Sequence, residues 1–195
     1  AVVIGTLIGL IAGYVRGSVD SLISLIIDFV WGFPLILVAV LMAASIGSGL
    51  VPVILAVALV NTVAIARVVR GEVLGISEKE FVAASKAGGY STLRILTRHI
   101  APNVIPVALV LSSYYIAVAI IAEAALSFVG MGAQPPLPSL GQMVSEGRNY
   151  MRLNHWESTI PGIIIFFMVL SVSLVGDGLR DLLDPRLRTA LDRTS

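Results

Sequence analysis

Few side chains in this sequence have the types and spacing that catalysis or metal binding requires. The chain has no cysteine, which excludes disulfides, zinc–thiolate sites and cysteine nucleophiles. Its two histidines, His99 and His155, lie far apart in segments of different character, so we expect no metal site. Asp177 lies in a Gly-Asp-Gly sequence without a second matching aspartate, and no metalloprotease, serine-hydrolase or Walker A motif is present. We therefore expect no catalytic residue and no cofactor bound by this chain.

Two carboxylates, Asp28 and Glu123, lie within long apolar segments. Charged groups in such segments are costly in a membrane, and they usually face the interior of a helix bundle or an aqueous cavity. The two side chains could line a translocation path, or they could form structural hydrogen bonds to a neighbouring helix with the acid protonated. The sequence leaves both roles open, and we favour the structural one.

The composition indicates a membrane protein. Hydrophobic residues make up 57% of the chain and charged residues 13%, and the mean hydropathy is +0.96. A soluble domain carries charges on about a quarter of its residues, so lipid is the expected solvent. The net charge of +1 argues against a nucleic-acid partner, which requires a concentrated basic face. The chain enters an apolar stretch directly, without the features of a signal peptide, and we expect it to be truncated at its start.

Five apolar segments predict about five membrane-spanning helices, at residues 1–15, 22–46, 50–66, 104–129 and 160–175. Pro34, within the second segment, and the glycines near it could bend helices or permit close packing; these glycines are Gly32, Gly47 and Gly49. The polar connections are at 16–21, 47–49, 68–103 and 130–159, with a polar tail from residue 176.

The distribution of Lys and Arg predicts the orientation. Only Arg148 and Arg152 fall on one side of the predicted membrane, and basic residues favour the cytoplasmic side. The central connection and the C-terminus are therefore predicted to be cytoplasmic. The other side holds eleven of the thirteen basic residues: Arg16, Arg67, Arg70, Lys79, Lys86, Arg94, Arg98, Arg180, Arg186, Arg188 and Arg193.

The central connection has the pattern of two short helices. Ser77 and Glu80 have the spacing of a capping box, which predicts a helix start. The pair Gly88-Gly89 is expected to end this helix, because glycine accepts the left-handed conformation. Ser91 is expected to cap a second helix, which Pro102 would stop. In that second helix the apolar face is predicted to comprise Leu93, Leu96 and Ile100.

This pair of helices has two interpretations. It could lie on the membrane surface as an amphipathic pair. Alternatively, the small residues of its first helix would permit the close approach of a cytoplasmic protein.

The same stretch resembles the EAA loop of ABC-importer permeases, whose pattern is E-A-A, three residues, G, nine residues and I-x-L-P. Ala84, Gly89 and Pro102 match this pattern, and Ala83 stands where the motif has its glutamate, so Glu80 is not the motif residue. The E-F-V-x-A and R-H-I-x-P-N variants are typical of the dipeptide, oligopeptide and nickel branch. The resemblance implies a loop at 71–103 that couples to an ATPase, with the residues Glu80, Ala83, Ala84, Gly88, Gly89, His99, Pro102 and Asn103.

Two further stretches, at 122–148 and 176–186, resemble the C-type permease subunit of that branch. The implied fold is all-α and polytopic, a single transmembrane domain of the type I (MetI-like) ABC importers over 1–195, in the cell (inner) membrane. The implied partners are cytoplasmic ABC ATPases that carry ATP and Mg, a second permease subunit forming a heterodimer, and an extracytoplasmic substrate-binding protein facing 130–159. That loop could also be a plain connector anchored by Trp156 and Tyr150.

The implied function is ATP-driven import of peptides by alternating access, with nickel or another small solute as the alternative. Two rival classes are a secondary transporter and an intramembrane enzyme. A secondary transporter would not need the docking pair of helices, and the enzyme class lacks a catalytic motif.

Overall fold

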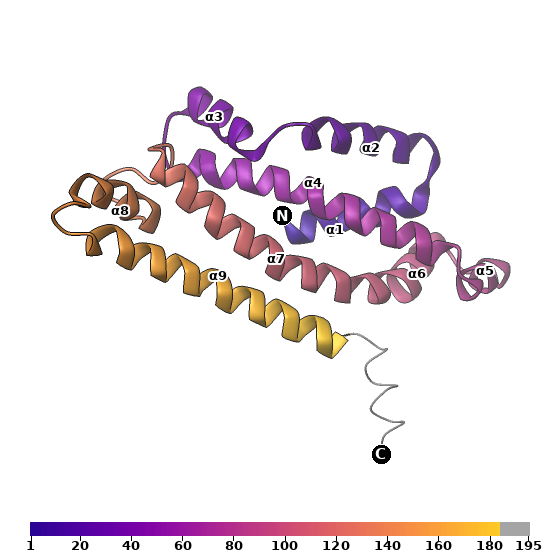
Figure 1. Cartoon of the computed structure of the whole chain (residues 1–195). Helices are drawn as coiled ribbons and strands as arrows, with labels where there is room; N and C mark the ends of the chain where they lie inside the picture. The colour runs from indigo at the N-terminus through magenta and orange to yellow at the C-terminus, as the bar shows by residue number, and fades with distance from the viewer. Residues whose placement is uncertain (184–195) are drawn as a thin grey trace, which may run out of the picture. The chain divides into compact units, whose positions relative to one another are not determined.

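A computed structural model describes residues 1–183, and all of their regular structure is helical (Figure 1). This confirms the all-α prediction. The predicted cytoplasmic tail from residue 184, with Arg186, Arg188 and Arg193, lies outside the described residues. The nine α-helices of the described part are α1 (Val2–Val15), α2 (Gly17–Trp31), α3 (Leu35–Ile46), α4 (Leu50–Ser77), α5 (Glu80–Ala87), α6 (Thr92–Ile95), α7 (Ala101–Phe128), α8 (Leu140–Gly147) and α9 (Trp156–Leu183).

The helices divide into two compact units. Unit 1 comprises Ala1–Asp28, Thr62–Ser113 and, of the described residues, 174–183. Unit 2 comprises Phe29–Asn61 and Tyr114–Ser173. Helices α4, α7 and α9 each supply residues to both units.

Three helical stretches among residues 1–183 are long and apolar enough to cross a membrane: Leu50–Ser77, Thr92–Phe128 and Trp156–Leu183. Helices α2 and α3 form a pair bent by 87°, which would make a fourth crossing if it acts as one span. Helix α1 is apolar but has only 14 residues. The number of five crossings therefore stays a prediction.

The composition of the apolar segment 22–46 suggested one continuous helix, but the structure divides it into two. Helix α2 ends at Trp31 and α3 begins at Leu35, after Pro34 with ψ of 138°. Proline cannot donate a backbone hydrogen bond, and it disfavours a helical conformation in the residue before it, so the break falls here. Gly47 and Gly49 lie in the turn between α3 and α4 with φ of +93° and +151°, and no neighbouring side chain is within 4 Å of either Cβ position. They serve the turn rather than helix packing.

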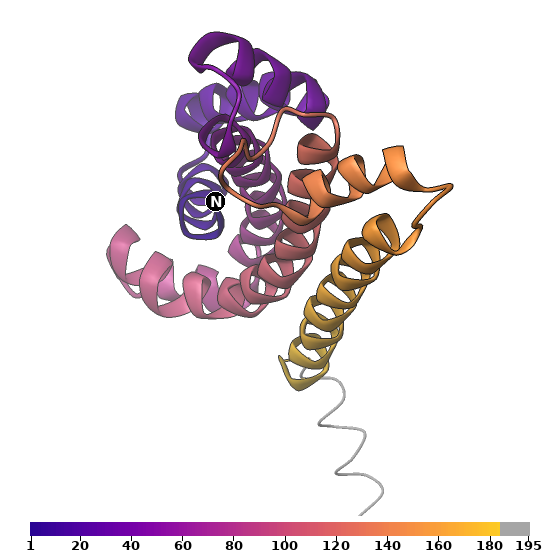
Figure 2. The same cartoon turned by 90° about the vertical axis from the view of Figure 1, so that its left-hand side faces the viewer.

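The core of unit 1 is a close contact between α1 and α4 (Figures 1 and 2). Gly5, Gly9 and Gly13 recur every fourth residue on α1, so they share one face of the helix. A Cβ at Gly9 would lie 2.7 Å from both the carbonyl oxygen of Ala66 and Cβ of Val69. The absence of side chains on this face therefore lets the two backbones approach.

The matching face of α4 is apolar and buried, and it consists of Ile65, Val69, Val73 and Ile76. This face extends α4 beyond residue 66, where the predicted apolar segment ended. The central connection therefore starts after Ser77 and not at residue 68.

In unit 2, α3, α4 and α7 share a hydrophobic core of Val38, Ala39, Val53, Ala56 and Leu126. The short helix α8 packs at the ends of α7 and α9. A Cβ at Gly141 would overlap the carbonyl oxygen of Ala124 on α7, and one at Gly147 would lie 2.6 Å from the backbone nitrogen of Ser158 on α9. Helix α8 is therefore fixed by backbone contacts at both of its ends.

Candidate functional site

The connection between α4 and α7 is a helical hairpin, formed by α5 and α6. The predicted capping box is wrong, because Ser77 is the last residue of α4 and α5 starts after Lys79 without a side-chain cap. The buried Val73 and Ile76 hold this end of α4 in the helix, so Ser77 is not available as an N-cap.

The two glycines end α5 as predicted. Gly88 has φ of −75°, whereas Gly89 has φ of +76°, the left-handed conformation that favours glycine. The Gly89 N–H donates to the carbonyl oxygen of Lys86 at 3.0 Å, and the Tyr90 N–H donates to that of Ser85 at 3.2 Å. Ser91 then caps α6, since its Oγ accepts a hydrogen bond from the Arg94 N–H at 3.4 Å.

The sequence predicted that Pro102 would stop the second helix, but it does not. Helix α6 passes through a π-helical turn, Leu96–Ile100, directly into α7, which gives a continuous helical stretch from Thr92 to Phe128. The wider π turn accommodates the proline ring and its missing N–H. The Asn103 side chain also donates to the carbonyl oxygen of His99 at 2.7 Å, which satisfies one carbonyl in this turn.

The hairpin buries one set of side chains and exposes another. Val82, Ile95 and Ile100 are buried, whereas Leu93 is 70% exposed. The predicted apolar face of the second helix is therefore wrong at Leu93, because the π turn shifts the register between residues 93 and 100. The large apolar side chains left exposed on the hairpin are those of Phe81, Tyr90 and Leu93.

Tyr90 is fixed in place by two neighbours. Its ring stacks on that of His99, with centroids 6.1 Å apart, and the Arg94 guanidinium carbon lies 4.4 Å from its centroid. The hairpin thus presents an aromatic side chain in a defined position.

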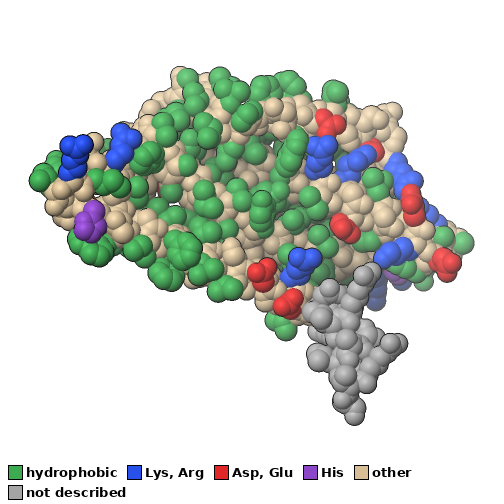
Figure 3. Space-filling model, viewed as in Figure 1, with side chains coloured by type: hydrophobic (Ala, Val, Ile, Leu, Met, Phe, Trp, Pro, Cys, Tyr) green, Lys and Arg blue, Asp and Glu red, His purple; other side chains and the backbone are tan. Residues whose placement is uncertain are grey.

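Of the coupling residues implied by the resemblance, His99 is half-buried and the others are exposed. The exposed residues on the hairpin are Glu80, Ala83, Ala84, Gly88 and Gly89. Pro102 and Asn103 lie at the start of α7 instead, where they line a groove of about 460 Å³ with Arg180 of α9. Figure 3 shows charged side chains of both signs gathered over the part of unit 1 that holds the end of α4 and the hairpin.

The carboxylates of α2 are paired with arginines of α4. Asp20 accepts two hydrogen bonds from Arg70, at 2.5 and 2.7 Å, and Asp28 lies 3.4 Å from Arg67. Arg67 and Arg70 both lie inside α4, so Arg70 is not in the polar connection 68–103 to which the sequence analysis assigned it. The sequence analysis also missed Asp20, whose signal was a carboxylate two turns before Asp28 on the same helix.

Glu123 on α7 has a different environment. Its Oε1 accepts a hydrogen bond from the Ser127 hydroxyl at 2.6 Å, and the Ser127 oxygen accepts one from the Ala133 N–H at 3.2 Å. The hydrogen bond of Glu123 is therefore within α7, whereas the sequence analysis expected one to a neighbouring helix. Glu123 also lines a cavity of about 360 Å³, walled by α7, by Leu140 of α8 and by Ile165 and Met168 of α9.

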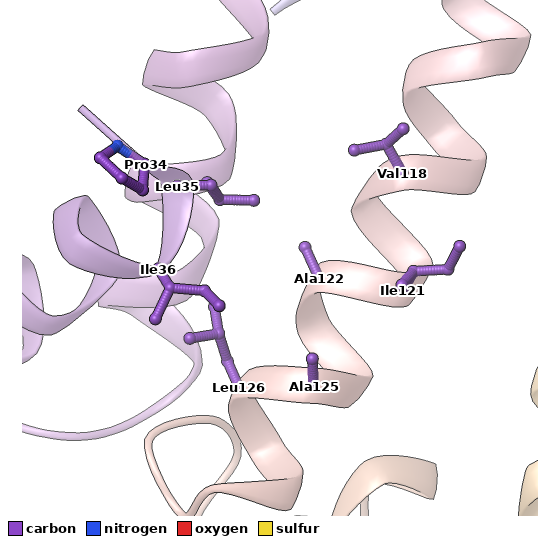
Figure 4. A pocket seen from close by; sticks show the side chains of 8 residues that line it. All are labelled: Pro34, Leu35, Ile36, Val118, Ile121, Ala122, Ala125 and Leu126. Atoms are coloured by element: carbon purple, nitrogen blue, oxygen red, sulfur yellow. The ribbon is translucent and has the colours of Figure 1, made fainter. Parts of the chain in front are cut away.

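A second cavity of unit 2 is wholly apolar. It has a volume of about 380 Å³ and lies between the start of α3 and the opposite face of α7 (Figure 4). No charged or hydrogen-bonding side chain reaches it, so it offers no chemistry for a polar solute. Its lining residues are Pro34, Leu35, Ile36, Val118, Ile121, Ala122, Ala125 and Leu126.

Within residues 1–183, no three His, Asp or Glu side chains gather where they could hold a metal ion. The geometry that stands out is therefore a helical hairpin joining two long apolar helices, together with carboxylates inside apolar helices.

Residues 5–189 match the family described as "Binding-protein-dependent transport system inner membrane component". The chain belongs to this family. It is 40% identical over 189 residues to the dipeptide transport system permease protein DppC of Alkalihalophilus pseudofirmus, covering 97% of this chain and 62% of the relative. It is 41% identical over 186 residues to the glutathione transport system permease protein GsiD of Pectobacterium atrosepticum, covering 95% and 62%.

A third relative is the di/tripeptide transport system permease protein DppC of Pseudomonas aeruginosa, which is 36% identical and covered to 61% of its length. The chain thus spans less than two thirds of these curated relatives. The fold is similar to that of a chain from the MetNI methionine ABC transporter in an inward-facing conformation, with a TM-score of 0.75, 20% identity and coverage of 93% of this chain and 87% of that one. The expected MetI-like fold is confirmed.

Proposed function

We propose that the whole protein is the membrane-spanning permease subunit of an ATP-driven importer of di- or oligopeptides. The names of the relatives favour peptides over nickel or other small solutes. The observation that carries the proposal is the hairpin between α4 and α7, because it joins two apolar helices and leaves large apolar side chains exposed.

In this proposal the chain holds no nucleotide. ATP and Mg bind to partner ATPases in the cytoplasm, and a second permease subunit completes the path. An extracytoplasmic binding protein delivers the solute to the side that holds α8. Nucleotide binding on one chain can move helices of another only through a physical contact, which we assign to the hairpin.

The exposed apolar side chains of the hairpin would form that contact. Phe81, Tyr90 and Leu93 are 41%, 43% and 70% exposed, and Tyr90 is held between Arg94 and His99. Aromatic anchors such as tyrosine carry much of the binding energy of protein interfaces. Burying these side chains in an apolar recess of an ATPase would be more favourable than leaving them exposed to water.

The test replaces Leu93, which is 70% exposed, in the full-length subunit co-expressed with its partners. We expect Leu93→Asp to leave membrane accumulation normal and to lower recovery of the ATPase by about tenfold or more, with loss of ATP-dependent peptide uptake. The matched control is Leu153→Asp, at a position that is 89% exposed in the connection between α8 and α9.

This control is expected to retain ATPase binding. Normal ATPase recovery with Leu93→Asp would contradict the proposed contact, and peptide uptake that persists without ATP would indicate a secondary transporter instead.

The orientation has its own test. The hairpin is cytoplasmic in this proposal and the connection after α8 is extracytoplasmic, following the distribution of Lys and Arg. These 195 residues contain no cysteine, so Leu93→Cys and Leu153→Cys each add one labelling site to them, and the protein without either substitution gives the background labelling. An impermeant thiol reagent added outside intact cells should label Leu153→Cys and not Leu93→Cys. The reverse labelling would overturn the orientation.

A further inference from the structure

Carboxylates in apolar helices need a compensating charge or a proton. Arginines of α4 compensate Asp20 and Asp28 in α2. No Lys or Arg within residues 1–183 pairs with Glu123, although its helix is just as apolar. Its recorded partner is the neutral Ser127 hydroxyl.

The Ser127 hydroxyl satisfies only part of the hydrogen-bond acceptor capacity of the Glu123 carboxylate. A serine hydroxyl carries one hydrogen, and Ser127 donates it to Oε1 of Glu123 while its oxygen accepts from the Ala133 N–H. Oε1 thus acts as an acceptor and is held on the α7 surface. Two carboxylate oxygens can accept about four hydrogen bonds, so Glu123 retains capacity for a further donor.

The space beside Glu123 can hold such a donor. The cavity of about 360 Å³ falls in the size range of small-molecule sites, and Glu123 is the one charged residue in its lining. The remaining walls are aliphatic and include Ile120, Ile165 and Met168. An apolar cavity with a single carboxylate fits a small amphipathic cation, whose charge meets Glu123 and whose carbon atoms contact the walls.

We propose that Glu123 binds the primary ammonium group of a transported solute, the α-ammonium of a peptide being the relevant case. This inference rests on the proposed function. It adds a binding residue on α7 and a chemical requirement on the solute, namely a free positive charge. The opposite cavity of α7, shown in Figure 4, has no carboxylate and should not share this preference.

The first experiment measures the charge of the cavity without relying on transport. Ala119 lies one helical turn from Glu123 and lines the same cavity, so Ala119→Cys reports on it in the full-length assembled complex. The measured quantity is the rate of the cationic reagent trimethylammonioethyl methanethiosulfonate divided by that of the anionic reagent sulfonatoethyl methanethiosulfonate. We expect this ratio to be about tenfold higher at Ala119→Cys than with free cysteine, because a nearby carboxylate attracts the cation and repels the anion.

Two controls isolate the role of Glu123. The preference should disappear in Ala119→Cys combined with Glu123→Gln. It should also be absent in Val118→Cys, which lines the apolar cavity on the other face of α7. Complexes without an introduced cysteine give the background rate.

The second experiment asks whether an ammonium group binds there. Propylammonium at millimolar concentration should slow the modification of Ala119→Cys by the neutral methyl methanethiosulfonate, whereas propanol should not. Glu123→Gln should abolish this protection.

A rate ratio of the two charged reagents no greater than that with free cysteine, or protection that is unchanged by Glu123→Gln, would overturn the inference and leave Glu123 with a structural role only. Import of dialanine by the wild-type complex tests the proposed function separately. If the wild type imports dialanine but Ala119→Cys shows no charge preference, only the ammonium site fails.

Discussion

Two neighbouring regions of unit 1 use the same residue types in opposite ways. In the α1–α4 contact, glycines remove side chains so that two backbones can touch, and the apolar residues of α4 are buried against them. In the α5–α6 hairpin, Gly89 serves a left-handed turn with open space around it, and Phe81 and Leu93 remain exposed. A substitution in the contact should therefore affect folding, whereas one in the hairpin should affect a partner.

The largest effect is expected for Gly9→Leu. Its side chain would overlap both the Ala66 carbonyl and Val69, and overpacking even a few methylenes costs about 1–3 kcal/mol where the backbone can adjust. Here the obstacle is backbone, so we expect the folded subunit to be lost, measured as membrane accumulation and monodispersity in detergent. Gly71→Leu on α4 is the matched control, because no neighbouring atom is within 4 Å of its Cβ position. Normal accumulation of Gly9→Leu would show that α1 does not pack on α4 as described.

Gly89→Asp should separate folding from function. The left-handed backbone costs a non-glycine residue about 1–2 kcal/mol, but no steric overlap adds to that strain. We therefore expect near-normal accumulation, with loss of ATPase binding and peptide uptake, since the strain and the added charge fall on the proposed docking surface. Quantifying the subunit and the co-purified ATPase from one detergent extract measures both. Wild-type ATPase recovery and uptake would remove the hairpin from the coupling role.

The two regions differ in how much of their structure could be predicted from the sequence. The hairpin was largely predictable, because Gly88-Gly89 and Ser91 are local signals that tertiary packing did not override. The capping box at Ser77 and the stop at Pro102 failed for a shared reason. The apolar face of α4 and the π turn extended helices past residues that favour ends when considered alone. Helix propensity is a weak signal when buried surface favours a longer helix.

The α1–α4 contact was missed, although Gly5, Gly9 and Gly13 stand at a four-residue spacing that is typical of close helix packing in membranes. The composition identified the apolar segment 1–15, but it did not indicate that this segment packs on α4. The pairing of Asp20 and Asp28 with arginines of α4 joins residues at least 39 positions apart, counted from Asp28 to Arg67, and no local pattern specifies it. The sequence singled out Glu123 as a carboxylate in an apolar segment, but its cavity is formed by three helices and no local pattern specifies it.

The ion pairs of unit 1 predict a smaller effect at the edge of the α1–α4 contact. The side chains of Arg70 and Asp20 are only 29% and 16% exposed and share two hydrogen bonds. Arg70→Gln should destabilise the subunit by about 1.5–3 kcal/mol, the usual value of a hydrogen bond to a charged group. The measurement is the thermal stability of the purified complex by light scattering. No change would mean that α2 is not held to α4 by this pair.

The smallest effect is expected where the α1–α2 turn meets the end of α4. The side chains of Arg16 and Glu78 are 50% and 71% exposed and lie 3.1 Å apart, so their ion pair contributes about 0–1 kcal/mol. Arg16 also has φ of +55°, which is unfavourable for a residue with a Cβ by about 1–2 kcal/mol. Arg16→Gln loses the pair and keeps the strain, so it should lower thermal stability slightly. Arg16→Gly loses the same pair but relieves the strain, and should therefore be at least as stable as wild type. If Arg16→Gly is less stable than Arg16→Gln, the turn does not carry the left-handed strain described, because both variants lose the same ion pair.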